Sequence, residues 1–335
     1  MHEFRKRIRP AMSRALAAFV EAGTDWDPGV IVAHPKILTA PVLAEHHDVP
    51  HMVAELTPTL TPTAEFPAAG IASKSLGAVI NRVSYGAVGM AGSMFASDVR
   101  AARRRLGVQQ RLPAPTASLV AISPTLLPRP ADWPTTAHIT GDWHHTTGGS
   151  PVDADLQAFI EADAPFIYAG FGSMTDGDPR IRAEAIIDGA RRTGLRVLMA
   201  TGWGGLQPPT RCLGTDVLVT ESVSHQEVLP HAVAAIHHGG AGTTHAVARA
   251  GIPSIVVPFL ADQPFWAVQL ERLGLASPPL HRNRLTRDRV RAAIAASMKC
   301  APRARQVAQH MSKEDGAKQA VSLIAKLTTA IGTEN

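Results

Sequence analysis

A glycine-rich segment in the last third of the chain carries the residue types best suited to chemistry. Residues 235–245 read Ala-Ile-His-His-Gly-Gly-Ala-Gly-Thr-Thr-His. The apolar run before them predicts a strand that ends at Ile236 or His237, and a helix is predicted from Thr243 to Ala250. Glycine lets a ligand approach the backbone closely, and the N–H groups at the start of a helix bind phosphate. We therefore expect a phosphate site at this turn.

Side chains beside the turn add hydrogen-bond donors for an anion. His238 can donate through its ring, and Thr243 or Thr244 can either cap the helix or donate to a phosphate oxygen. Charge-assisted bonds of this kind contribute about 1.5 to 3 kcal/mol each, and a few of them would account for a micromolar nucleotide site. The segment has neither the Lys-Ser/Thr of a P-loop nor the Gly-x-Gly-x-x-Gly of dinucleotide folds. The alternative is a tight turn whose glycines serve packing alone.

A second loop places two polar side chains among apolar residues. Asp262 and Gln263 lie within Val257-Pro-Phe-Leu-Ala-Asp-Gln-Pro-Phe-Trp266, directly after a predicted strand. An adjacent carboxylate and amide can hydrogen-bond sugar hydroxyls and fix their orientation. Capping of the following helix by Asp262 is the alternative.

Strands that alternate with helices must position both loops. From residue 165 onward this alternation predicts a parallel sheet covered on both faces. The predicted strands are 165–169, 196–200, 216–219, 234–237 and 254–257, and helices are predicted at 179–193 and within 286–331. Ligands bind such sheets at the carboxyl ends of the strands, where the two loops lie.

The first part of the chain predicts a second, less regular α/β unit. Its strands are predicted at 29–35, 51–55, 119–122 and 138–140, its helices at 36–48 and 73–106, and a Thr- and Pro-rich loop at 56–70. A polar, Gly-containing stretch then has the composition of a linker. We therefore predict an N-terminal domain over 1–141, a linker over 142–155 and a C-terminal domain over 156–335.

The two loops together resemble the donor signature of family 1 glycosyltransferases. The segments that carry the resemblance are His238-Gly-Gly-Ala-Gly-Thr243, Ala250-Gly-Ile-Pro253, Val257-Pro258 and Asp262-Gln263. They are most similar to the branch of bacterial antibiotic and sterol/lipid glucosyltransferases. Further similar segments upstream are Phe171-Gly-Ser-Met174, Gly202-Trp-Gly-Gly-Leu206, Ser224-His-Gln226 and Leu229-Pro230. The resemblance covers about residues 25–330 and is strongest over 165–275.

This resemblance implies an α/β fold of the GT-B type, in which two Rossmann-like domains with parallel sheets face each other across a cleft. The donor-binding residues that it implies are Ser173, Trp203, Val223, His225, Gln226, His238, Gly239, Gly240, Gly242, Thr243, Asp262 and Gln263. The glycine turn and Ser173 would hold the pyrophosphate, residues 223–226 would face the base and ribose, and Asp262 with Gln263 would bind the sugar. Trp203 would line the nucleotide side or else belong to the domain core. Neither a metal nor a cofactor is expected besides the donor substrate.

The N-terminus departs from the family pattern. Family members begin with a strand and a Gly-rich loop that carries the catalytic Asp or His. Residues 1–20 instead predict a basic helix with Phe4, Ile8, Met12 and Leu16 on one face, so we expect the first domain to be incomplete. The catalytic base is then unidentified, with His34 as a candidate because it follows a predicted strand. His144, His145 and His245 are expected to be solvated or structural.

Bulk composition excludes several classes of protein. The 335 residues are 45% apolar and 18% charged, with a net charge of +5 and only 5% aromatic residues. The basic residues are scattered, except at the N-terminus and over Arg100–Arg105, and they lack interleaved aromatics, so we expect no nucleic-acid binding. Cys212 and Cys300 have no ligand spacing, and a reducing cytoplasm fits best. The basic N-terminal helix leaves open a peripheral contact with the inner face of the membrane.

The sequence thus predicts an inverting glycosyltransferase that moves a hexose from a UDP- or dTDP-sugar to a hydroxyl of a hydrophobic acceptor, such as a lipid, a sterol or a polyketide- or peptide-type molecule. The alternative is a catalytically impaired protein that binds a nucleotide sugar but lacks the usual base loop. A sugar-nucleotide epimerase of the same architecture is a third reading, against which the Asp-Gln-Pro-Phe-Trp segment argues.

Overall fold

The computed structural model describes residue 6, residues 8–144 and residues 153–332, and it contains two parallel sheets. The C-terminal sheet has five strands in the order β7-β6-β5-β8-β9. These are β5 (Phe166–Gly170), β6 (Arg196–Ala200), β7 (Val217–Thr220), β8 (Ala234–His237) and β9 (Ser254–Val256). Every predicted strand of this half is confirmed, with ends that differ by at most one residue.

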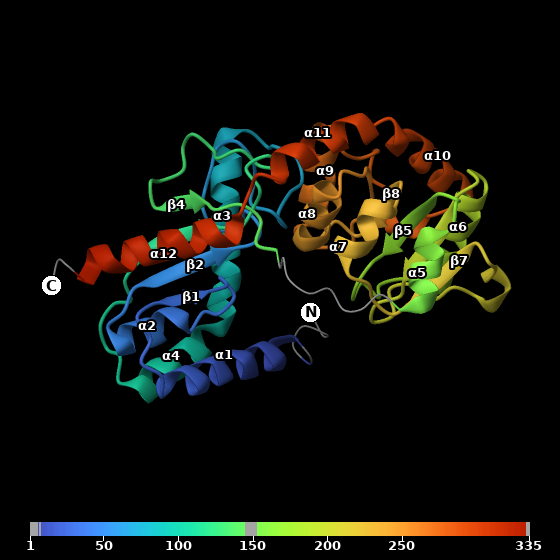
Figure 1. The fold of residues 1–335 in the computed structure, drawn as a ribbon. Helices are drawn as coiled ribbons and strands as arrows, with labels where there is room; N and C mark the ends of the chain where they lie inside the picture. Colours follow the sequence, from blue (N-terminus) through green and yellow to red (C-terminus); the bar gives the residue numbers. More distant parts are fainter. Residues whose placement is uncertain (1–5, 7, 145–152, 333–335) are drawn as a thin grey trace.

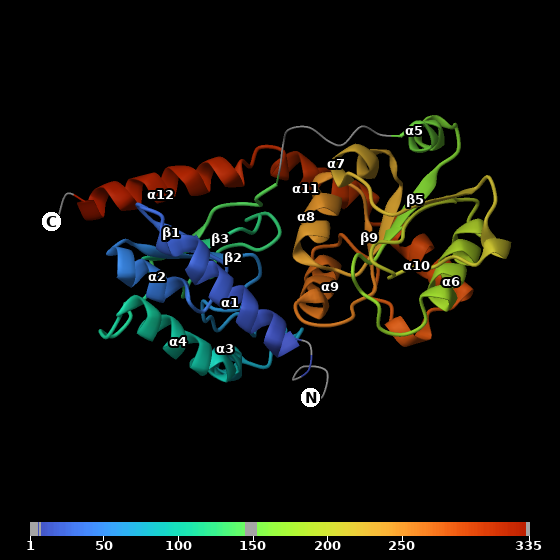
Figure 2. The same cartoon turned by 90° about the horizontal axis from the view of Figure 1, so that it is seen from below.

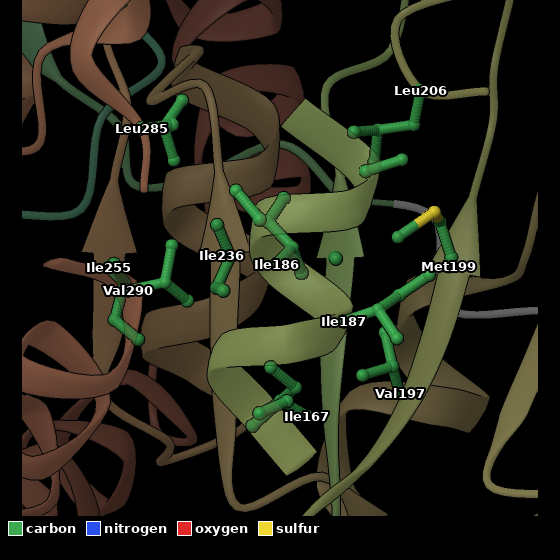
Figure 3. Close-up of a cluster of buried hydrophobic side chains, with 14 of the residues drawn as sticks. Ile167, Ile186, Ile187, Val197, Met199, Leu206, Ile236, Ile255, Leu285 and Val290 are labelled. Carbon is green, nitrogen blue, oxygen red and sulfur yellow. The ribbon is translucent and has the colours of Figure 1, made fainter. Parts of the chain in front are cut away.

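Helices cover both faces of the C-terminal sheet, as Figure 1 shows. They are α5 (Ala154–Glu161), α6 (Pro179–Arg191), α7 (His225–Val228), α8 (Ala241–Arg249), α9 (Gln263–Arg272), α10 (Arg287–Met298) and α11 (Ala301–Met311). Side chains of β5 alternate between the two faces of the sheet. Ile167 packs with Ile186 of α6 and Val290 of α10 (Figure 3). Phe166 packs on the other face, on the side of α5. Burial on both faces explains why these strands are apolar throughout.

The N-terminal sheet has four parallel strands in the order β1-β2-β3-β4. These are β1 (Ile31–Ala33), β2 (His51–Glu55), β3 (Ala117–Val120) and β4 (Ala137–Ile139), and they accompany α1 (Arg9–Thr24), α2 (Ala40–His47), α3 (Ala78–Gly92) and α4 (Ala96–Leu106). The helices predicted over 73–106 are α3 and α4, and the first of them begins at Ala78, later than predicted. A short 3-10 turn at Ser93–Phe95 separates α3 from α4, and its Phe95 is buried.

The last helix, α12 (Gly316–Gly332), lies against the N-terminal sheet although it follows the C-terminal one along the chain (Figure 1). Leu323, Ile324 and Leu327 of this helix pack on Met52 and Leu119 of the sheet. The chain therefore crosses between the two sheets twice. Residues 145–152 of the predicted linker lie outside the described residues, as do Phe4 of the predicted first helix and His145.

The two halves share a continuous apolar core. Ile122, Leu126 and Trp133 of the N-terminal half cluster with Trp266 and Met311 of the C-terminal half. Polar contacts accompany the cluster, since Gln269 Nε2 donates to the Leu126 carbonyl at 2.7 Å and Arg249 pairs with Asp142 at 2.8 Å. Within the described residues, no helix has the length and apolar character needed to cross a membrane.

Candidate functional site

The strand order of the C-terminal sheet places its ligand crevice between β5 and β8. The chain runs outward from β5 through β6 to β7, then returns to add β8 and β9 on the other side of β5. Such a reversal opens a crevice at the carboxyl ends of the two strands that flank it. The loop after β5 contains Ser173, and the loop after β8 contains residues 238–242. The predicted phosphate turn therefore lies at the switch point.

The glycine turn leaves the N-terminus of α8 available to an anion. The N-cap of α8, Gly240, has no side chain to cap the helix, and the N–H groups of a first helical turn lack intrahelical partners. The Asp262 carboxylate lies near this end, because the Ala241 N–H is among the groups that lower its pKa. Gly239 has a φ of +86°, and a Cβ there would lie 2.7 Å from Val256. Only glycine satisfies both the conformation and the packing at this position. Thr243 is half-buried at the start of the helix, and the buried hydroxyl of Thr244 has no partner among the described residues.

His237 holds the turn in place through both nitrogens of its fully buried ring. Its Nδ1 accepts the N–H of Gly239 at 3.2 Å, so Nε2 carries the proton and donates to Ser254 Oγ at 3.0 Å. Burial lowers the pKa of His237 to about 3, with smaller contributions from His238 and His225. The residue is therefore neutral at physiological pH and acts as a fixed bridge from the sheet to the turn.

His238 faces the loop that carries Ser173. A Cβ on Gly172 would lie 3.8 Å from the His238 ring, and one on Gly240 would lie 2.5 Å from its Nε2. Burial, followed by the nearby His225, lowers the pKa of His238, and a hydrogen bond with the Gly170 backbone opposes this shift. Nε2 is the ring nitrogen that lies beside Gly240, the N-cap of α8. A ring nitrogen in this place can donate a hydrogen bond to a ligand at the helix N-terminus.

The loops after β5 and β6 contact each other backbone to backbone. A Cβ on Gly202, whose φ is +55°, would collide with the carbonyl oxygen of Gly172. Ser173 is exposed at this junction. Trp203 is 83% exposed, so the reading of Trp203 as a core residue is wrong and its ring is free to contact a ligand.

The loop after β7 is tied to the central strand. The Tyr168 hydroxyl of β5 shares a hydrogen bond of 3.0 Å with His225 Nε2, and the two rings pack edge to face. Burial raises the pKa of Tyr168, which keeps the hydroxyl protonated. Val223 is half-buried and Gln226 is exposed in the same loop. The structure thus brings His225 close to His238, on the side of the crevice where the nucleoside was expected.

Asp262 and Gln263 differ in what their side chains do. The Gln263 amide oxygen accepts the N–H groups of Phe259 and Leu260 at 2.7 and 3.1 Å, and its nitrogen contacts Met174 Sδ at 3.3 Å. Gln263 is buried and organises its own loop. Asp262 makes no capping bond at the start of α9, so the capping alternative is not what the structure shows. The preceding Ala261 has a φ of +57°, a strained conformation of the kind that clusters at functional sites.

The N-terminal half approaches this loop directly. A Cβ on Gly70 would lie 3.5 Å from the backbone of Ala261. Burial raises the pKa of Asp262, and this shift is opposed by Trp266, by the Lys36 ammonium of the loop after β1 and by the Ala241 N–H at the start of α8. The Asp262 carboxylate therefore lies within reach of both the phosphate helix and the N-terminal half.

His34 lies in the same loop as Lys36 and is half-buried. Its Nδ1 accepts the N–H of Lys36 at 3.1 Å. Burial, and then Lys36, lowers the pKa of His34. The neutral ring consequently carries its proton on Nε2, which leaves that nitrogen no lone pair for a proton from an acceptor in this arrangement. His34 as the base remains a prediction.

The other histidines serve packing or lie apart from the crevice. His245 is buried, its Nδ1–H donates to the Ala241 carbonyl at 2.7 Å, and its Nε2 accepts the N–H of Ser123 at 3.2 Å. His144 lies 3.5 Å from Asp142. Sequence reasoning assigned no role to His237, Tyr168 or Lys36. The one available signal was a polar residue, His237, at the end of an otherwise apolar strand.

Comparisons with known proteins show which proteins the chain is similar to. Residues 204–331 match the family "Erythromycin biosynthesis protein CIII-like, C-terminal domain". The chain is 33% identical over 225 residues to O-mycaminosyltylonolide 6-deoxyallosyltransferase of Streptomyces fradiae, an alignment that spans 64% of the chain and 50% of that enzyme. It is 27% identical over 314 residues to a sterol 3-beta-glucosyltransferase of Leptosphaeria maculans, spanning 88% of the chain and 22% of that enzyme.

Among solved structures, the glycosyltransferase VinC in complex with dTDP superposes with a TM-score of 0.64 at 18% identity, covering 95% of the chain and 76% of VinC. The chain therefore shares the fold of VinC. The chain spans half the length or less of the two curated relatives described above.

Proposed function

We propose that this chain, a member of the family 1 glycosyltransferases of the GT-B type, transfers a hexose from a UDP- or dTDP-sugar to a hydroxyl of a hydrophobic acceptor. The observation that carries the proposal is the N-terminus of α8, whose N-cap is a glycine, at the switch point of the C-terminal sheet, with the His238 ring beside it. A nucleotide diphosphate supplies the negative charge and the acceptors that this arrangement lacks.

The donor would lie along the carboxyl edge of the C-terminal sheet. Its diphosphate contacts the N–H groups of Gly242 and Thr243, the His238 ring and the exposed Ser173. The base and ribose extend toward Val223, His225 and Gln226, with the exposed Trp203 ring available for stacking. Asp262 accepts hydrogen bonds from the sugar hydroxyls, while Gln263 positions Asp262 by holding the loop.

The reaction displaces the nucleotide diphosphate from the anomeric carbon with inversion. The acceptor oxygen forms a bond to that carbon, the bond to the diphosphate oxygen breaks, and the acceptor proton passes to a base. Negative charge that develops on the leaving group faces the helix N-terminus and His238, which stabilise it without reorganisation. In this proposal the chemistry requires no metal or cofactor besides the donor.

The acceptor would dock on the N-terminal half, between the loop over 56–70 and the helices over 73–106. Leu56, Leu60 and Ile71 are exposed there, and Leu260 is exposed on the facing loop of the C-terminal half. The relatives' names point to antibiotic and sterol acceptors, which offer a hydroxyl on a largely apolar body. We place the reaction in the cytoplasm, where Cys212 and Cys300 would stay reduced.

A specific observation supports a second candidate. Because His34 Nδ1 accepts the Lys36 N–H, the candidate base lacks a free lone pair. A protein that binds the nucleotide sugar without transferring it would have this arrangement. Sugar-nucleotide epimerisation would need no acceptor at all, so turnover of the donor alone separates it from both.

Calorimetric titration with UDP-glucose and dTDP-glucose tests the donor site first. Saturable binding of either one is expected, and absence of binding by a folded sample would overturn the proposal. A transfer assay with sterol and polyketide acceptors then separates the two candidates. Acceptor-dependent release of nucleotide diphosphate indicates a transferase, and donor binding without release indicates a binding protein.

A further inference from the structure

Helix α3 presents its apolar residues to solvent and its polar residues to the protein. Val79, Val83 and Met90 recur at spacings of four and seven, which places them on one helix face. Their exposed fractions are 77%, 69% and 75%. The buried residues of the helix are instead Asn81, Ser84 and Tyr85. We call the three exposed side chains the α3 stripe.

The polar face of α3 is buried because it holds the loop over 63–69. Asn81 Nδ2 donates to the Ala64 carbonyl, Ser84 Oγ accepts the N–H of Ala68, and the Tyr85 hydroxyl donates to the Phe66 carbonyl. These bonds fix the rotation of the helix about its axis. The α3 stripe is therefore held outward by the fold, and a contiguous apolar surface of this kind marks a contact with a partner or a membrane.

The helix that follows the stripe is basic. α4 carries Arg100, Arg103, Arg104 and Arg105 against one acidic residue, Asp98, and Asp98 lies 4.0 Å from Arg9, which offsets its charge. Arg82 of α3 is paired with Asp132 at 2.8 Å. A cavity of about 470 Å³ next to α4 is lined by Arg100, Arg103 and Arg104. Figure 2 shows α3 and α4 together along the edge of the N-terminal half opposite α12.

We propose that the α3 stripe and the arginines of α4 dock this protein on the surface of an anionic phospholipid bilayer. The apolar side chains insert at the level of the headgroups, and the arginines bind lipid phosphates. The inference rests on this surface alone and does not depend on the proposed transferase activity.

Charge distinguishes a membrane from a second copy of the chain as the occupant. A two-fold dimer across the stripe would bring two identical surfaces together. Each surface carries the arginines of α4, so their charges would repel, whereas an anionic bilayer attracts them. No acidic residue between Glu65 and Asp98 is available to offset that repulsion.

Co-sedimentation with vesicles tests the proposal with the full chain. The probes are vesicles of phosphatidylcholine alone and of phosphatidylcholine with about one third phosphatidylglycerol. We expect binding to the second kind only, weakened at about 0.5 M salt. Val83→Glu and the pair Arg100→Glu with Arg104→Glu should each lower the partition coefficient by about tenfold or more.

Val321→Glu is the matched control, because Val321 is 66% exposed on α12, along the opposite edge. This variant should bind vesicles like the wild type, and circular dichroism should show that all variants are folded. Equal effects of Val83→Glu and Val321→Glu, or equal binding to both kinds of vesicle, would overturn the proposal. So would a dimer in light scattering that Val83→Glu converts to a monomer, since that would make the stripe a self-association surface.

Discussion

At the scale of single residues, the phosphate turn depends on a histidine that touches no ligand. The His237 ring joins Gly239 of the turn to Ser254 of the neighbouring strand. The turn must aim several N–H groups at one point, and a misplaced donor loses much of its contribution. We therefore regard His237 as a positioning residue, distinct from His238, which faces the crevice.

Two substitutions at position 237 separate its two hydrogen bonds. An Asn amide oxygen can take the place of Nδ1 and accept the Gly239 N–H, whereas a Gln amide reaches toward Ser254 instead. We expect His237→Asn to keep the dissociation constant of the nucleotide diphosphate within about threefold, and His237→Gln to raise it about tenfold. Calorimetry measures both, with Ser254→Ala as the control for the second bond. Equal losses in the two variants at position 237 would contradict the role of the Gly239 bond.

Asp262 and Gln263 should respond differently to truncation. Asp262→Ala is expected to weaken binding of the nucleotide sugar by about tenfold, because only the sugar would contact this carboxylate. Binding of the free nucleotide diphosphate should stay unchanged. Gln263→Ala leaves two buried N–H groups unpaired. It should weaken both ligands and lower the free energy of unfolding by about 1 to 3 kcal/mol. If Asp262→Ala weakened both ligands alike, its assignment to the sugar would be wrong.

The local part of this site was accessible from the sequence. A glycine turn between a strand and a helix needs only neighbouring residues, so the phosphate turn and its adjoining loops were predicted. The contact of Gln263 with Met174 could not be predicted, because Met174 is distant along the chain, whereas its bonds to Phe259 and Leu260 are local. The exposure of Trp203 likewise depends on how two loops pack, which no local pattern encodes.

At the scale of elements, periodicity predicted the strands well and the long-range packing poorly. Buried parallel strands are continuous apolar runs, which explains the close agreement for β5 to β9. The position of the turn at Ser93–Phe95 between α3 and α4 could not be predicted, because the surrounding composition is helical throughout. The packing of α12 on the N-terminal sheet could not be predicted either, since an amphipathic helix does not specify which sheet it covers.

The crossing of α12 over the N-terminal half requires glycine. A Cβ on Gly316 would lie 2.5 Å from the carbonyl carbon of Gly141 and 2.5 Å from the Asp142 oxygen. We expect Gly316→Ala to lower the free energy of unfolding by about 1 to 3 kcal/mol, although alanine favours helices. Gly89→Ala is the control, because it meets nothing within 4 Å in α3 and should stabilise by about 0.5 to 1 kcal/mol. Urea unfolding measures both, and stabilisation by Gly316→Ala would refute the close approach.

At the scale of the whole molecule, the phosphate helix is also part of the junction between the two halves. His245 of α8 accepts the Ser123 N–H from the N-terminal half and donates to the carbonyl of Ala241, the first residue of the helix. Ser123 and Thr125 donate in turn to Glu314, just before α12. A change in the angle between the halves would therefore act on the helix that faces the donor.

This junction should weaken in acid because His245 must remain neutral. Burial lowers the pKa of His245 below the ordinary value for histidine, which is about 6.5, so protons bind the unfolded state first as the pH falls. Its contribution is therefore complete above pH 6.5 and is lost below it. Between pH 7.5 and 5.5 we expect the free energy of unfolding to fall by up to about 1.4 kcal/mol through this residue alone.

Urea unfolding of the wild type and of His245→Gln at the two pH values isolates the contribution of His245 to the free energy of unfolding. Gln keeps a donor and an acceptor but does not titrate, so the variant should lose up to about 1.4 kcal/mol less than the wild type on acidification. His231→Gln, at an exposed position, serves as the control and should lose as much as the wild type. If His245→Gln showed the same acid sensitivity as the wild type, the neutral His245 bridge would not be what joins α8 to the N-terminal half, and the coupling between domain angle and donor site would have to run through the Arg249–Asp142 pair instead.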